Sequence, residues 1–144
     1  MKSNFLFSST SSILRIDYAL LILRFAVAGS MVYAHGFGKF QKIITGEEIQ
    51  FVDPFGLGPV VTFSMVMFAE FICASLIALG LFTRIALVPL IINMAYIVFV
   101  HHGADGFGSQ ELPFIYLAVF VALFLTGPGK HSFDRLIKRV KSTV

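Results

Sequence analysis

Two ionisable residues of opposite charge lie inside long apolar runs of this chain. Arg24 interrupts the first run and Glu70 the second, and both runs are long enough to cross a bilayer. A charged side chain near the middle of a membrane helix costs about 3 kcal/mol on insertion scales, so each needs a compensating environment. We expect the two side chains to meet inside a helix bundle, as a structural lock or as a working polar site.

Asn93, in the third apolar run, completes this predicted site. At about 1.5 Å per residue, Arg24 and Asn93 lie roughly 10 and 13 Å from the same membrane side and Glu70 lies roughly 20 Å from it. Contact between Arg24 and Glu70 is compatible with these depths but is not required by them. Arg24, Glu70 and Asn93 are therefore the catalytic candidates. The alternative is that the charges only hold the bundle together, or that Arg24 extends to the headgroups.

A second polar group falls in the connections predicted on the other membrane side. His35 and Lys39 follow the first run, His101 follows the third, and Glu111 precedes the fourth. They can converge on one rim that binds a quinone headgroup, an anionic ligand or a soluble subunit, and they can shuttle protons. Ordinary interfacial polarity explains the same residues without a ligand. Haem or metal ligation is disfavoured, because the histidines sit at the rim and adjacent His101 and His102 point different ways.

The composition determines which elements must position these residues. Of 144 residues, 57% are hydrophobic and 13% are charged, about half the charge of a typical soluble domain. The apolar runs are unbroken rather than alternating, which predicts membrane helices and not a barrel. Cys73 is the single cysteine, so any redox chemistry needs a cofactor or a partner. Phosphate loops, a Ser-His-Asp order and paired catalytic carboxylates are not recognisable in the sequence.

Four spans are predicted, at residues 17–33, 60–82, 85–100 and 112–126, and the last two are short enough to need flanking residues such as 107–111. Only Thr83 and Arg84 join the second and third spans, which makes them antiparallel neighbours. The predicted fold is thus an all-α antiparallel four-helix transmembrane bundle. A short interfacial helix is expected early in the first connection, where Phe40, Ile43 and Ile44 share one side.

Basic residues predict the orientation and the flanking segments. Eight Lys or Arg residues fall on the side of the two termini and two on the other side, so both termini are expected in the cytoplasm. Residues 1–16 form a cytoplasmic N-terminus, residues 17–129 the membrane domain, and residues 130–144 a basic amphipathic tail. The tail follows a membrane exit, which favours binding to an anionic lipid surface over binding to nucleic acid.

Several short motifs together resemble one family. Their matching positions are Arg24, Gly36, Lys39, Glu70, Gly80, Arg84, His101, Glu111 and the Gly127-Pro128-Gly129 turn. In order and spacing these are similar to the DoxX family of small bacterial membrane proteins. The resemblance implies a four-helix integral subunit of the bacterial inner membrane. Family members are named for a thiosulfate-oxidising, quinone-reducing membrane complex, and others are associated with oxidative or thiol stress. The long outer loop rich in Gly and Pro is a departure that alters the expected partners.

The sequence therefore leads to the hypothesis of an integral membrane subunit of a quinone-linked redox complex. Quinone is the candidate cofactor, and the bilayer, other redox subunits and a second copy of the chain are the candidate partners. Two alternatives stay open: a small-solute or proton transporter or channel, and a non-catalytic membrane anchor for soluble redox partners.

Overall fold

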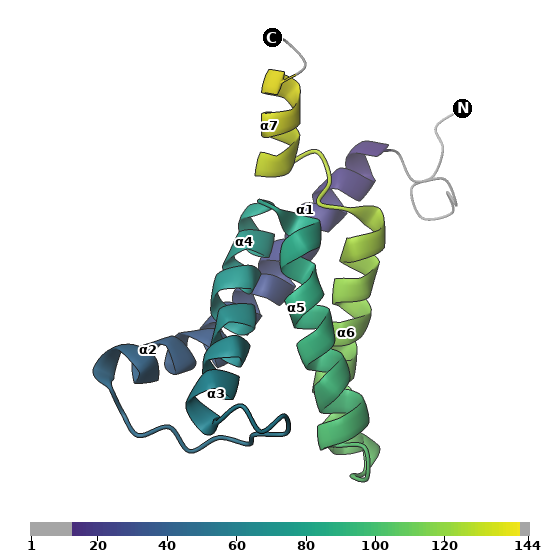
Figure 1. Cartoon of the computed structure of the whole chain (residues 1–144). Helices are drawn as coiled ribbons and strands as arrows, with labels where there is room; N and C mark the ends of the chain where they lie inside the picture. The colour runs from purple at the N-terminus through teal and green to yellow at the C-terminus, as the bar shows by residue number, and fades with distance from the viewer. Residues whose placement is uncertain (1–12, 142–144) are drawn as a thin grey trace, which may run out of the picture.

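Four long apolar helices run through the molecule. The computed structural model describes residues 13–141, and within this range every regular element is helical. Consecutive long helices alternate in direction and pack against one another (Figure 1). The helical stretches long and apolar enough to cross a membrane are Arg15–Thr45, Pro59–Leu79, Thr83–His101 and Phe107–Thr126. The predicted all-α four-helix membrane bundle is confirmed.

The first stretch bends out of the bundle after it has crossed it. It consists of α1 (Ile13–Met31), the π-helical segment η2 (Val32–Gly36) and α2 (Phe37–Thr45), without a break. Figure 1 shows α2 leaving the bundle sideways, at the place where a short helix was predicted. It ends at Gly46, whose left-handed φ of 69° closes the helix, as glycine does at many C-termini.

The second and third stretches form a tight hairpin. The second consists of α3 (Pro59–Met67), η3 (Phe68–Cys73) and α4 (Ala74–Leu79). Gly80, with a φ of 73°, ends α4, and the N–H of Leu81 donates to the carbonyl of Leu76 at 2.9 Å. The turn lies just before the predicted joint at Thr83 and Arg84, because Gly80 and Phe82 both take left-handed φ values.

The remaining elements complete the bundle and the tail. The third stretch is α5 (Thr83–Tyr96) followed by η4 (Ile97–His101), and α5 packs along α6 (Phe107–Thr126). As expected, the fourth span includes the residues from Phe107 onward. After a turn, α7 (Phe133–Lys141) forms the amphipathic C-terminal helix and extends away from the bundle (Figure 1).

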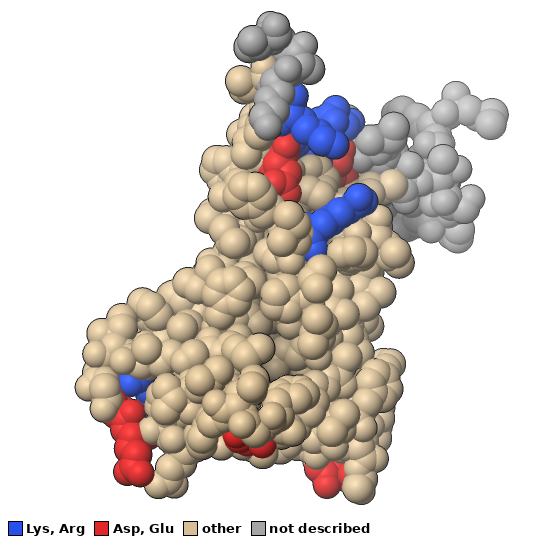
Figure 2. Space-filling view, in the orientation of Figure 1, with Lys and Arg blue, Asp and Glu red and all other residues tan. Residues whose placement is uncertain are grey.

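The surface of the bundle is an apolar belt. Its core is filled by small and branched side chains such as Ala28, Ala74 and Leu90, whereas Ile22, Ile85 and Leu125 are each about 70% exposed. Figure 2 shows a belt without charge between two charged ends: Lys and Arg gather near α7 with acidic groups beside them, and acidic groups with some Lys or Arg lie at the opposite end. Such a belt buries its apolar surface only in lipid, so the chain is a membrane protein. We call the two ends the α7 end and the loop end, the latter carrying residues 46–58.

Candidate functional site

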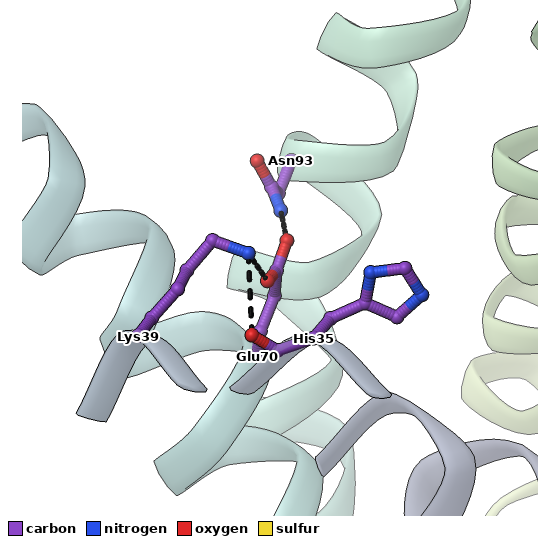
Figure 3. Close-up of polar contacts among 4 residues, drawn as sticks. All are labelled: His35, Lys39, Glu70 and Asn93. Carbon is purple, nitrogen blue, oxygen red and sulfur yellow. Dashed lines mark hydrogen bonds and ion pairs between the residues drawn. The ribbon is translucent and has the colours of Figure 1, made fainter. Parts of the chain in front are cut away.

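Glu70 is buried and is the centre of a polar cluster toward the loop end. Its carboxylate is 2.5 Å from the Lys39 ammonium and accepts a hydrogen bond of 2.9 Å from the Asn93 amide. The three side chains come from η3, α2 and α5 and point toward one another (Figure 3). Because the Glu70 side chain is 5% exposed and each of its oxygens has a partner, the desolvation cost of this charge is offset.

A glycine allows Lys39 to reach this position. Lys39 also donates to the carbonyl of His35, one turn earlier, at 3.3 Å. Between them, Gly36 packs directly on the backbone of Glu70: a Cβ atom at Gly36 would lie 2.4 Å from the Glu70 carbonyl oxygen. A residue with a side chain would push the first stretch away from η3, and Lys39 with it. The close packing at Gly36 therefore places Lys39 within reach of Glu70.

Three π-helical turns carry residues of the predicted site. His35 lies in η2, Glu70 in η3 and His101 in η4. A π turn inserts one residue into an α-helix and changes the direction in which the following side chains point, and such turns are frequent at functional sites. Hydrophobic periodicity does not reveal them, because they occur within continuous apolar runs.

The polar cluster lies on the wall of a cavity of about 970 Å³. Most of the lining is apolar and comes from α3, α5 and the 46–58 segment. Its polar residues are His35, Lys39, Thr62, Ser64, Glu70, Asn93, His101 and His102. An apolar cavity with a few convergent polar groups is the usual form of a small-molecule site.

The histidines are distributed around this cavity rather than gathered in it. The His35 ring points away from the ion pair (Figure 3) and packs edge-on against Tyr116 at 6.0 Å. His102 pairs with Asp105 at 2.6 Å, and His101 lies exposed beside it with the two ring centroids 4.6 Å apart. Within residues 13–141, no group of three or more His, Cys, Asp or Glu is arranged to hold a metal ion.

The predicted rim is brought together only in part. His35, Lys39 and His101 line the cavity, and Lys39 extends further inward than a rim residue, to the buried carboxylate. Glu111 does not line the cavity and lies exposed near the start of α6. Sequence reasoning assigned Lys39 to the rim because the close approach at Gly36 is a tertiary feature.

Arg24 does not meet Glu70, contrary to our expectation. It is fully buried, but its guanidinium donates to the carbonyl of Ile77 at 3.5 Å and to that of His131. Ile77 lies two helical turns from Glu70 toward the α7 end, about 10 Å away along the helix. Side chains tilt toward the N-terminus of their helix, which directs Arg24 to the α7 end. The ion-pair partner of Glu70 is Lys39 instead.

Arg24 belongs to a second polar cluster, which we call the α7-end clamp. It consists of Asp17, Arg24, Thr83 and Asp134. The Asp134 carboxylate accepts hydrogen bonds from the N–H and hydroxyl of Thr83 at 3.0 and 2.9 Å, which caps the start of α5. Asp17 accepts the N–H of Lys130 at 2.9 Å. The clamp joins α1, the α4–α5 turn and the segment before α7, and its contacts are those of a structural lock.

Comparison with known proteins agrees with this arrangement. The DoxX family model matches residues 19–103, more than half of the chain, from α1 through η4. An uncharacterised protein of Haemophilus influenzae is 33% identical over 132 residues, which cover 87% of each chain. No solved structure matches the chain significantly. The matched region contains the whole Glu70 cluster, and its length shows that the chain belongs to the DoxX family.

Proposed function

We propose that this chain is an integral membrane subunit of a quinone-linked redox complex, and that the Glu70 cluster binds the quinone headgroup. The observation that carries the proposal is the Lys39–Glu70 ion pair, with its buried carboxylate, on the wall of a mostly apolar cavity within helices long and apolar enough to cross the membrane. Apolar walls suit a lipid-soluble ring, and the polar cluster supplies the few directed contacts that such a ring needs.

The donors at the cavity fit a quinone. A quinone presents two carbonyl oxygens that accept hydrogen bonds, and when bound it accepts electrons and protons. Lys39 and Asn93 can each donate to one oxygen, and both already lie within hydrogen-bonding distance of Glu70. Glu70 can hold a proton beside the ring, as a general acid or base must. The cavity, at about 970 Å³, is at the upper end of the range of ligand sites.

Electrons must come from another subunit. The single cysteine, Cys73, is buried, and it cannot form a dithiol pair within the chain. A soluble or membrane redox partner therefore supplies them, and this chain provides the quinone site in the membrane. We further propose that it lies in the bacterial inner membrane with the α7 end in the cytoplasm, since Arg84, Lys130, Arg135, Lys138 and Arg139 all lie at that end.

Purification of the full chain in mild detergent, followed by solvent extraction and mass analysis, tests the proposal. We expect quinone in the wild-type protein and at least about tenfold less in Glu70→Gln, because the amide removes the charge that orders Lys39. Glu48→Gln, at an exposed loop position, is the matched control and should retain the quinone.

Folding of each variant is checked by its thermal unfolding midpoint in detergent. A folded Glu70→Gln protein that keeps the full amount of quinone would contradict a headgroup site at Glu70. A wild-type protein that copurifies with a soluble enzyme but never with quinone would favour the anchor alternative.

A further inference from the structure

The cavity beside Glu70 has an open side between α3 and α5. Three apolar residues of its lining, Val61, Met65 and Ile92, are also about half exposed or more. Ile92 has an exposed fraction of 64% although it lies midway along the Thr83–His101 span. The neighbouring face of α5, which includes Leu90, is fully buried against the bundle. The open side thus faces the lipid belt.

The opening extends through about one leaflet. Ile92 lies at the midpoint of its span, and Val61 lies in the first turn of α3 at the loop end. At about 1.5 Å per residue, the stretch from Ile92 in α5 to His101 in η4 covers roughly half the thickness of the hydrocarbon core. A ligand in the cavity therefore has a path to the acyl chains of the leaflet at the loop end.

The 46–58 segment lines the same cavity at its loop end. Figure 1 shows it passing below α3 toward the foot of α5 and returning to α3. Two of its aromatic rings hold it to both helices: Phe55 packs against Tyr96 of α5 at 5.9 Å, and Phe51 against Phe63 of α3 at 5.3 Å. The segment thus bridges the gap at the end where water would otherwise reach the cavity.

Asp53 fastens this cover. Its carboxylate accepts hydrogen bonds from the N–H of Gly58 at 2.7 Å, from the hydroxyl of Thr62 at 2.8 Å and from the N–H of Leu57 at 3.1 Å. These contacts satisfy groups at the start of α3 and hold the segment in a defined position. A fastened cover at the aqueous end and an open side in the apolar belt impose one direction of access.

We propose that the ligand reaches the cavity sideways from the lipid, through the gap between α3 and α5, and that it is an amphiphile whose apolar chain stays in this gap. We call the gap the side portal. The proposal rests on the proposed function in so far as the headgroup is a quinone. Its physical basis is that α3 and α5 offer lipid-exposed apolar walls to the apolar chain of the ligand. The Glu70 cluster at the inner wall offers polar contacts to the ligand headgroup.

The chain contains no tryptophan, so a single introduced tryptophan reports on the cavity. In Tyr96→Trp protein reconstituted in lipid, brominated acyl chains should quench the fluorescence strongly, and acrylamide in the water should quench it weakly. Val61→Phe in the same background should reduce lipid quenching by narrowing the side portal. Ile115→Phe, on the exposed face of α6, is the matched control and should leave it unchanged. Strong acrylamide quenching with weak lipid quenching would overturn the side portal.

Binding of two quinones with the same headgroup tests whether the ligand needs an apolar tail. A quinone with an isoprenoid chain should bind the wild-type protein at least about tenfold more tightly than its chainless analogue, since buried methylene groups add affinity. Val61→Phe should slow the association of the isoprenoid quinone and leave the association rate of the chainless analogue unchanged. Equal affinities for the two quinones would show that the apolar tail does not contribute to binding. Lipid quenching at residue 96 without binding of either quinone would refute the proposed function and leave the side portal supported.

Discussion

At the scale of single residues, Glu70 illustrates what a sequence can reveal and what it cannot. A carboxylate within an apolar run must have a partner, which made Glu70 and the nearby Asn93 candidates from the sequence. The choice of Arg24 as partner was wrong, because charge and approximate depth do not determine the direction of a side chain. Lys39 takes that place through the contact of Gly36 with the Glu70 backbone.

Substitution of Gly36 tests this contact. Gly36→Ala should separate η2 from η3, weaken the Lys39–Glu70 pair and destabilise the protein by about 1–3 kcal/mol, the usual result of overpacking a core. Gly38→Ala, two residues further on, is the matched control, because a Cβ atom there would meet nothing within 4 Å. Thermal unfolding in detergent measures the stability of both variants. An equal unfolding midpoint for the two variants would show that the close approach does not matter.

At the scale of elements, hydrophobic runs revealed the four spans, but the π turns and the cover of the cavity depend on tertiary contacts. The 46–58 segment was predicted only as a connection with turns. Asp53 makes it an ordered cover, and its position outside the membrane spans allows a test by pH. The hydrogen bond from Gly58, together with those from Thr62 and Leu57, holds the pKa of Asp53 below its ordinary value.

The direction of this pKa shift predicts how the cover responds to acid. A group whose pKa is lowered in the folded state stabilises that state above its unfolded pKa, and this contribution is lost as the pH falls through the lowered value. Acrylamide quenching of Tyr96→Trp protein should therefore rise below the ordinary pKa range of aspartate. With Asp53→Asn added, quenching should be high already at neutral pH and nearly independent of pH. A cover that stays closed in acid would contradict the role of Asp53.

At the scale of the whole molecule, polar groups lie at two levels with different roles. The Glu70 cluster lies on the cavity wall toward the loop end, whereas the α7-end clamp joins the helix ends far from the cavity. The fold class was predictable because the composition and the unbroken apolar runs can be read directly from the sequence. This separation into two levels was not, because it depends on how each charged side chain is directed within the assembled bundle.

Replacement of Arg24 distinguishes the two levels. Arg24→Met removes the donors to Ile77 and His131 and the electrostatic interaction of Arg24 with Asp134. The unfolding free energy should fall by about 3–5 kcal/mol, as when one member of a buried charged group is removed. Amide exchange in residues 127–141 should increase, because Arg24 no longer holds the segment before α7.

The quinone affinity of the folded Arg24→Met protein should stay within about twofold of wild type, since Arg24 contacts no residue of the Glu70 cluster. Thr83→Val, which loses the hydroxyl contact with Asp134, is the matched control for the clamp and should loosen the same segment to a smaller extent. If Arg24→Met lost quinone while exchange in residues 127–141 stayed slow, Arg24 would act on the ligand and the clamp would not be its role.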